Sequence, residues 1–564
     1  MKRYIAILLL QLLMAGCLYS FSQTGQVQLS YVPADKNHEF AFTIQPEQTD
    51  SPGLKKHMAN IVFEMQSHGY VNASVDSFML FDTTLIIHYC TGAMFSWGNI
   101  NIEGLDEQEI RSSGVRLKRI KGSKIRAQEF STITRKIIIE LENTGYPFAR
   151  IKLVPEETEG KQIDGILRVT KNKRFIIKDF HLKGYDNIYP EYIYRQVGIH
   201  PGDPYNEKQI QSIGGNIQNI PFLETIRAPE VEFQKSSADI FLYVKKKKAN
   251  RFYGILGIAP SSEITGKALL TGEVSLLLIN SIKRGETVRF DWKKLDQSSQ
   301  NLYLGFSYPF VLKSPIGIDF SFILDKQDSS FLNTNAKSGL QYLLPGGNNI
   351  HVFYNILVSN KLLDNAENLN NSKANLFGIG IAFSKLDYLF NPRKGFLTDL
   401  EISTGAKKFT SDESAESTAQ TIFKSYGELF IPVFKNATLL FRSQTALIKT
   451  DQLYLNELFR IGGLKTIRGF DEQSLNASFY QTISIEPRYL FEQNSNAFLF
   501  FDYAFVETNY TDFTGSNKLI GFGLGTSFQT KAGIFTVSYA LGKEEQLPVQ
   551  FRNAKIHFGF ANRF

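Results

Sequence analysis

The sequence is poor in cysteine and has no strong excess of charge of either sign. It holds two cysteines in 564 residues, and Lys and Arg outnumber Asp and Glu by only 62 to 55. If the N-terminal apolar segment with Cys17 is removed, Cys90 is the only cysteine left, which excludes an internal disulfide. The one dense basic run, residues 245–248, is interpreted as a solvated turn or linker; a contact with acidic lipid head groups is the alternative.

Long apolar runs and catalytic motifs are also missing. Past the N-terminus, no apolar run approaches the roughly 18 residues that a membrane-spanning helix needs. There is no Gly-x-Ser-x-Gly elbow and no Walker loop, and the eight histidines are scattered without metal-ligand spacing. We therefore expect no enzymatic activity, no metal and no cofactor.

Residues 1–22 are predicted to be a signal peptide. Lys2 and Arg3 precede an apolar run, and the residues before Gln23 fit the small-x-small cleavage pattern. The stretch that ends at Cys17 also resembles a lipoprotein box, so either lipidation of Cys17 or its removal remains open. For an exported chain of this kind, a nucleic-acid partner is not expected.

After the signal peptide, helical and strand patterns alternate with an internal repeat. The pairs Gly69-Tyr70 and Gly145-Tyr146, and the strand-ending glycines Gly104 and Gly184, recur at intervals of roughly 75 to 80 residues. Such a period predicts three similar small α+β modules, which we place at residues 23–97, 98–173 and 174–248.

From about residue 249 to 564 the helical pattern disappears. Apolar residues alternate with small or polar ones over sixteen successive segments, and aromatic residues make up 13% of the whole chain. This period of two and the even number of strands are typical of a transmembrane β-barrel of about 16 antiparallel strands. A large soluble β domain is the alternative, but no helices or apolar layers are left to cover so many strands.

The longest late connection, after the eleventh strand, contains Ile467-Arg468-Gly469-Phe470. With the modules and the strand number, this stretch resembles the sixth external loop of the BamA/TamA-type outer-membrane assembly factors, in which POTRA domains precede a 16-stranded surface-antigen-type barrel. Residues 484–491 and 498–505 resemble the two strands that follow this loop, with Glu486 and Asp502 as their acidic residues. Asp502 is followed by Tyr503-Ala504, where the family often has a glycine two places after the aspartate.

The resemblance implies a bacterial outer-membrane protein with its N-terminal modules in the periplasm. It implies a role in assembly or insertion, with outer-membrane client proteins and outer-membrane lipids as partners, and it is compatible with accessory periplasmic or lipoprotein partners. The alternative is a secretion transporter for one dedicated partner protein, of the two-partner type. A passive pore would need neither three modules nor an arginine in the loop.

Two sites follow for this chain. An arginine folded into a barrel needs an anion, so we expect Arg468, Gly469 and Phe470 to lock the loop to Glu486, Asp502 or both. The second site is a lateral seam between the first and last strands, because glycines weaken strand pairing and an open edge could template a client strand. The predicted seam residues are Gly254, Gly257, Phe558, Phe560 and Phe564.

Overall fold

The computed structural model describes residues 28–34, 51–81, 84–117, 120–156, 160–185, 187–259, 269–294, 299–363, 366–388, 391–410, 417–511, 513–530, 533–545 and 551–561. The predicted signal peptide, with Cys17, and the seam residue Phe564 lie outside these ranges. The chain divides into two compact units: one ends at Phe175 and takes in Pro204–Glu207, and the other comprises Ile176–Asp203 and Lys208–Phe564. In the described ranges no helix has the length and apolar character needed to cross a bilayer.

The first unit contains two small α+β modules. In the first, α2 (Ser51–Ser67) covers a sheet of β1 (Gln28–Pro33), β3 (Thr84–Cys90) and β2 (Ser74–Phe81), with β1 parallel to β3. Its core joins Ile61 and Met65, four residues apart on one helix face, to the alternating Leu85, Ile87 and Tyr89 of β3.

The second module repeats this plan with different helices. Its sheet has the order β4 (Ser96–Glu103), β6 (Gln162–Thr170), β5 (Arg150–Pro155), and β4 runs parallel to β6. A capping box between Asp106 and Glu109 begins the short helix α3 (Glu107–Ser112). The longer α4 (Ala127–Asn143) buries Ile137 and Leu141 against the sheet.

The third module lies in the second unit. It consists of β7 (Ile176–Lys183), α5 (Pro190–Val197), α6 (Glu207–Gln218), β8 (Leu223–Thr225), β9 (Glu230–Gln234) and β10 (Ser237–Lys246). β10 is central, parallel to β7 and antiparallel to β8 and β9. Lys245 and Lys246 therefore end a strand, and the interpretation of 245–248 as a turn or linker is wrong for these two residues, because the β8–β10 ladder continues through Lys246.

The glycines that marked the sequence repeat share one backbone geometry. Gly69, Gly104, Gly145 and Gly184 have φ values from +92° to +105°, a region that residues with a Cβ rarely adopt. A Cβ on Gly184 would lie 2.5 Å from the carbonyl oxygen of Val244 on the neighbouring strand. The repeat therefore records turns and close strand contacts that each module needs.

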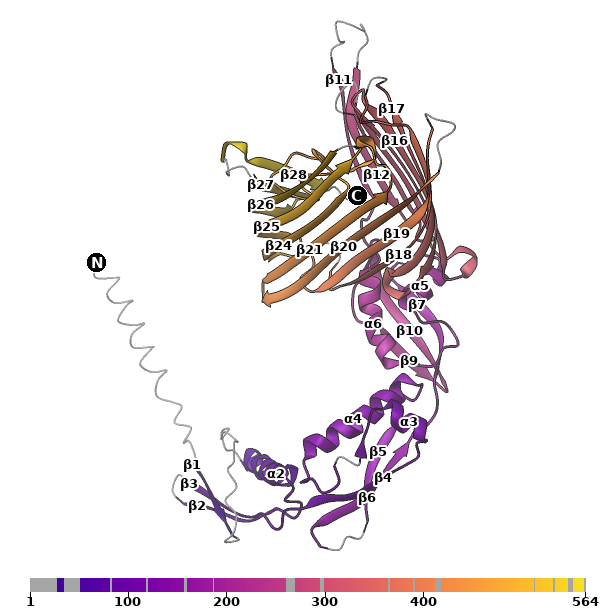
Figure 1. Cartoon of the computed structure of the whole chain (residues 1–564). Coiled ribbons are helices and arrows are strands. Elements are labelled where there is room, and N and C mark those ends of the chain that lie inside the picture. Colours follow the sequence, from indigo (N-terminus) through magenta and orange to yellow (C-terminus); the bar gives the residue numbers. More distant parts are fainter. Residues whose placement is uncertain are drawn as a thin grey trace, which may run out of the picture. The chain divides into compact units, whose positions relative to one another are not determined.

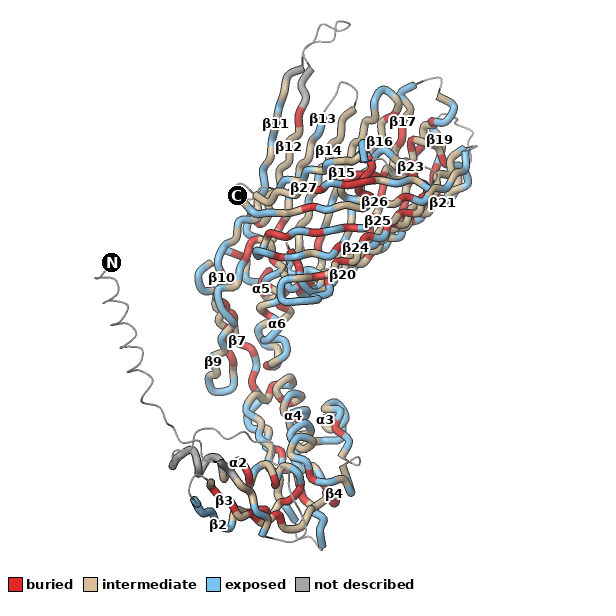
Figure 2. Tube along the Cα trace, turned by 90° about the vertical axis from the view of Figure 1, so that its left-hand side faces the viewer, coloured by how far each residue is buried: buried red, intermediate tan, exposed pale blue. Residues whose placement is uncertain are grey.

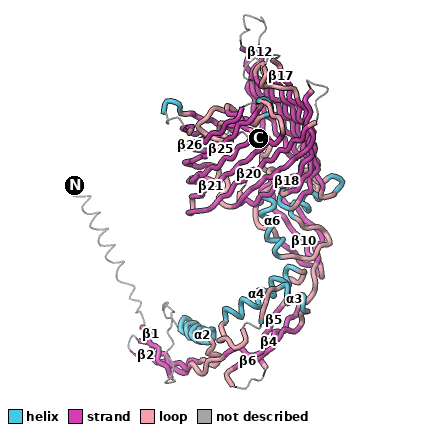
Figure 3. Tube along the Cα trace, in the orientation of Figure 1, coloured by secondary structure: helices cyan, strands magenta, loops and turns pink. Residues whose placement is uncertain are grey.

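The rest of the second unit is one antiparallel sheet of sixteen strands in sequence order (Figures 1 and 3). The predicted number of strands is confirmed. The strands are β11 (Arg251–Ala259), β12 (Leu269–Ile279), β13 (Thr287–Lys294), β14 (Gln300–Tyr308), β15 (Ile316–Gln327), β16 (Phe331–Leu343), β17 (Asn349–Lys361), β18 (Ser372–Leu386), β19 (Gly395–Phe409), β20 (Thr418–Phe434), β21 (Ala437–Thr450), β24 (Phe479–Glu492), β25 (Ser495–Tyr510), β26 (Phe513–Gln529), β27 (Ile534–Glu544) and β28 (Lys555–Ala561).

Burial alternates along these strands with the period of two that the sequence predicts (Figure 2). On β25, Phe500 and Asp502 are buried on the inner face of the curved sheet, whereas Leu499 and Phe501 are exposed on the outer face. A polar and apolar inner face combined with an apolar outer face is the pattern of a membrane barrel.

The third module packs against turns of this sheet. The Tyr192 ring of α5 contacts the Phe310 ring with centroids 5.7 Å apart, and the backbone N–H of Tyr189 donates to the carbonyl oxygen of Lys283 at 3.1 Å. Burial raises the pKa of the Tyr192 hydroxyl far above its ordinary value, so this group stays neutral. The contact thus combines aromatic packing with backbone hydrogen bonding.

Candidate functional site

The loop of residues 451–478, between β21 and β24, lies against the inner face of the sheet. It contains a 3-10 turn, η4 (Leu455–Glu457), and a short hairpin of β22 (Phe459–Ile461) and β23 (Leu475–Ala477). Ile467 is fully buried and joins Phe470, Ala504, Val506 and Leu519 in one apolar cluster of loop and wall residues. This segment is therefore a packed part of the interior.

Arg468, at the tip of the loop, contacts both predicted carboxylates. Its Nε and Nη2 donate to the two oxygens of Asp502 at 2.7 and 2.6 Å, and its Nη1 donates to Glu486 at 2.7 Å. The backbone N–H of Arg468 also donates to Asp502, at 3.2 Å. The side chains are only 5%, 3% and 3% exposed, so each charge depends on the others for its compensation.

Three further wall residues complete the arginine site, and the sequence analysis did not find them. Ser484 Oγ accepts from Arg468 at 2.9 Å and donates to Asp502 at 2.6 Å. Arg488 donates to the second oxygen of Glu486 at 2.7 Å. The centre of the Phe500 ring lies 3.7 Å from the central carbon of the Arg468 guanidinium. Ser484 and Arg488 flank Glu486 at a spacing of two, so strand alternation would have placed them on the same face.

The tip backbone packs directly onto the backbone of two wall strands. Gly469 has a φ of +93°, and a Cβ there would lie 2.6 Å from the backbone nitrogen of Gly542 on β27. A Cβ on Gly542 would in turn lie 2.5 Å from the carbonyl oxygen of Gly469, and a Cβ on Gly521 of β26 would clash with Arg468. Glycine is needed at these positions because the loop and the wall have no space for side chains between them.

The tip also contacts the last strand. The backbone N–H of Gly469 donates to Nε2 of His557 at 3.3 Å, and the Lys555 ammonium lies 2.7 Å from the Asp471 carboxylate. Together with the contacts to Glu486, Asp502 and the two wall glycines, the tip touches every strand from β24 to β28. The Arg468 site and the end of the sheet are therefore adjacent.

The predicted seam residues that the structure describes, Gly254, Gly257, Phe558 and Phe560, lie at the two ends of the sheet. In the ranges described, the strand order runs from β11 to β28 and no ladder joins these two strands. Gly254 and Gly257 lie on β11, and the Tyr253 ring of this strand lies 6.1 Å, centroid to centroid, from the Phe560 ring of β28. Phe558 is 75% exposed, and a cavity of about 440 Å³ is lined by residues from both ends.

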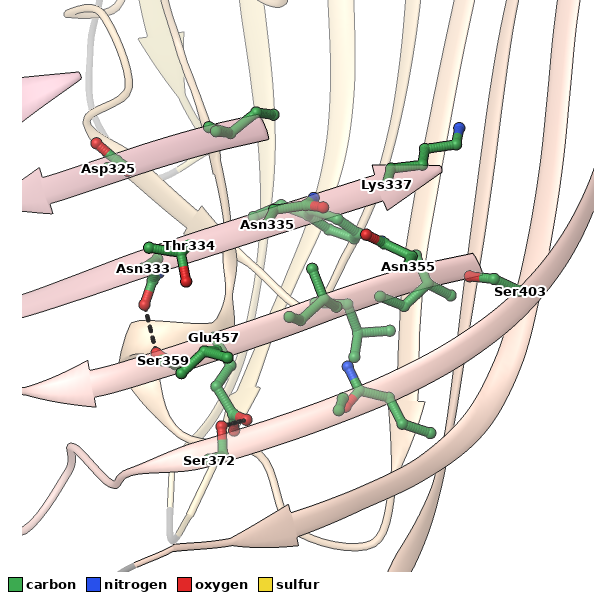
Figure 4. A pocket seen from close by; sticks show the side chains of 18 of the residues that line it. Asp325, Asn333, Thr334, Asn335, Lys337, Asn355, Ser359, Ser372, Ser403 and Glu457 are labelled. Carbon is green, nitrogen blue, oxygen red and sulfur yellow. Dashed lines mark hydrogen bonds between the residues drawn. The ribbon is translucent and has the colours of Figure 1, made fainter. Parts of the chain in front are cut away.

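The first arm of the loop, which precedes β22 and includes η4, contacts a different part of the wall (Figure 4). Glu457 accepts from Ser372 on β18 at 2.6 Å and from the Lys407 ammonium on β19 at 2.7 Å. The amide of Asn456 donates to Ser359 on β17 at 2.7 Å, and its backbone carbonyl accepts from Asn333 on β16 at 2.6 Å. These contacts lie beside a cavity of about 400 Å³ inside the curved sheet.

This architecture, a 16-stranded antiparallel sheet with a buried internal loop and preceding α+β modules, defines a β-barrel of the outer-membrane protein-transport and insertion class with POTRA domains. Residues 280–564, more than half of the chain, match the Omp85 superfamily domain. The chain belongs to the Omp85 superfamily. Members of this superfamily are non-enzymatic transport and assembly factors that handle outer-membrane client proteins, with barrels in the outer membrane and POTRA domains in the periplasm.

The solved structures that the chain is similar to have low sequence identity to it. CdiB from Escherichia coli is 15% identical, with 91% of this chain and 98% of that chain covered and a TM-score of 0.53. CdiB from Acinetobacter baumannii is 14% identical, with 83% of this chain and 90% of that chain covered and a TM-score of 0.52. BamA from Haemophilus ducreyi lacking POTRA domains 1–3 is 14% identical, with 83% of this chain and 100% of that chain covered and a TM-score of 0.43. No curated protein matched the sequence.

Proposed function

We propose that this protein assembles or inserts outer-membrane proteins by pairing client strands with the edges of β11 and β28. The observation that carries the proposal is the end of the sheet: neighbouring strands from β11 to β28 are paired, but no ladder joins the two ends in the described ranges. An edge strand presents backbone donors and acceptors that an extended client segment can pair with. The periplasmic modules would guide the client to this edge.

In this proposal the Arg468 site holds the loop that supports the client-binding edge. The tip contacts β28 through Gly469 and Asp471, so a shift of the tip would also move the last strand. Partners of the protein would be client barrels and membrane lipids, and accessory periplasmic or lipoprotein partners fit the same role.

Crosslinking the two ends tests the proposed edge. Leu256→Cys and Phe558→Cys, in a Cys90→Ser background, are designed to form a disulfide across the seam. We expect loss of client insertion when the disulfide forms and recovery on reduction. A control pair on the stable β15–β16 ladder, Phe322→Cys with Ala336→Cys, should leave insertion unchanged. Full activity of the crosslinked seam would contradict lateral opening.

A secretion transporter for one dedicated partner is the second candidate, and the buried loop bears on it. Passage through the barrel would require displacement of a loop whose tip and first arm are both bonded to the wall. Depletion of the protein separates the two functions. A general loss of outer-membrane barrels supports assembly, whereas loss of a single exported protein supports secretion.

A further inference from the structure

The first arm of the loop forms a buried ion pair with the wall, between Glu457 of the arm and Lys407 of β19. The Lys407 side chain is fully buried and that of Glu457 is 7% exposed, with 2.7 Å between ammonium and carboxylate. Lys407 also donates to the carbonyl oxygen of Gln452 at 2.7 Å, and the same Glu457 oxygen accepts from the backbone N–H of Tyr454 at 2.9 Å. Such a pair fixes the geometry of its neighbours because separating it leaves a stranded charge.

Asn456, next to Glu457, fixes the arm through a second set of bonds. Only 1% of this residue is exposed. Its side-chain amide donates to Ser359 Oγ at 2.7 Å and to the carbonyl oxygen of Asn370 at 2.8 Å, and its side-chain oxygen accepts from the backbone N–H of Asn370 at 3.3 Å. The arm is thus bonded to β16, β17, β18 and β19, whereas the tip is bonded to β24, β25 and β28 and packs against β26 and β27.

We propose that Lys407 and Glu457 form a second lock of the loop, separate from Arg468, and that the doubly locked loop is a strut across the barrel interior. The strut joins the middle of the wall to its last strands. Because no ladder joins the ends of the sheet in the described ranges, this internal link positions the last strands relative to the middle. Lys407 and Glu457 are positioning residues in this view; the inference rests on the proposed function of the seam.

Limited trypsin digestion of the detergent-solubilised full-length protein tests the two locks separately, without a client. Arg460 lies close to the first arm and Lys465 close to the tip. In Lys407→Met and in Glu457→Gln we expect cleavage after Arg460 to become at least about tenfold faster, because local opening sets the cleavage rate. Cleavage after Lys465 should stay near the wild-type rate. Arg468→Ala should give the opposite pattern.

Two further variants make the test specific. The double variant Lys407→Met/Glu457→Gln removes both charges and should be cleaved more slowly after Arg460 than either single variant. Lys337→Met is the matched control: Lys337 pairs with Glu401 inside the same barrel, but this pair joins two wall strands and does not involve the loop. It should leave both cleavage rates unchanged.

Three results would overturn the second lock. The first is a cleavage rate after Arg460 that equals the wild-type rate in both single variants. The second is a double variant in which the effects of the two substitutions on this rate add up. The third is faster cleavage after both Arg460 and Lys465 in every variant. If the single variants do not fold, Ser372→Ala removes one hydrogen bond to Glu457 and should still accelerate cleavage after Arg460. An unchanged rate in that variant would also overturn the proposal. The cleavage rates report only on how the loop is held. A failed insertion assay would therefore count against the proposed function and not against this test of the second lock.

Discussion

Arg468 and Asp502 meet through a two-pronged contact in which Nε and Nη2 of the guanidinium each donate to a separate carboxylate oxygen, at 2.7 and 2.6 Å. The planar fork of arginine matches a carboxylate in a way that the single ammonium of lysine does not. The two residues lie 34 positions apart in the sequence, and the short strand β23 and the full wall strand β24 lie between them.

Replacement of the arginine should unseat the loop. Arg468→Ala leaves Asp502 and Glu486 buried with too few cations, which costs about 3–5 kcal/mol of folding free energy. Arg468→Lys should restore the charge but not the fork, and we expect an intermediate loss. The temperature at which the heat-modifiable band shifts on a gel measures the effect. Arg552→Ala, at an exposed position in another loop, is the control; equal shifts in Arg468→Ala and Arg552→Ala would contradict the lock.

Ser484 should contribute through its hydroxyl alone. Ser484→Ala leaves a donor of Arg468 and an acceptor of Asp502 without this partner, and we expect a loss of about 1–3 kcal/mol. Ser538→Ala on β27 is a matched control, because Ser538 is 1% exposed and its Oγ has no hydrogen-bond partner in the described ranges. Denaturant unfolding of both variants measures the difference. A similar loss in the two would show that burial, and not the bond to Arg468, explains the effect.

A methyl group between the loop tip and the wall should separate them. In Gly542→Ala the new Cβ would meet the carbonyl oxygen of Gly469 at 2.5 Å, so either the loop or β27 must shift. We expect faster proteolysis of the loop and lower client insertion. Gly427→Ala on β20 is the control, because its nearest neighbour lies 3.9 Å away. Wild-type proteolysis in Gly542→Ala would contradict the close packing of loop and wall.

The Asp471–Lys555 pair should affect the last strand locally and not the whole fold. The two side chains are 70% and 36% exposed, so the pair contributes about 1 kcal/mol or less to overall stability. Asp471→Asn should nevertheless speed amide hydrogen exchange in β28, while exchange in β16 stays unchanged. Glu545→Gln, which breaks the similarly exposed pair with Lys518, is the control. Unchanged exchange in β28 would mean that the tip does not hold this strand.

The sequence was sufficient for the architecture because local rules produce it. Alternation with a period of two predicted a barrel of about sixteen strands, and the sheet contains sixteen. The glycines of the modules recur because their positions have positive φ, which residues with a Cβ rarely adopt. The burial of Arg468 between two carboxylates was an expectation from charge compensation, and both carboxylates contact it.

The other contacts of the loop come from residues that are far apart in the sequence. Ser484, Phe500 and the wall glycines Gly521 and Gly542 reach Arg468 and Gly469 through the curvature and register of strands far apart in sequence. The ion pair of Lys407 with Glu457 spans 50 residues, and no local pattern marks either residue as a partner of the other. The strands, the modules and the need for an anion near Arg468 could be predicted from the sequence, because these features depend on neighbours along the chain. The partners depend on how the sheet curves, which is a property of the assembled wall.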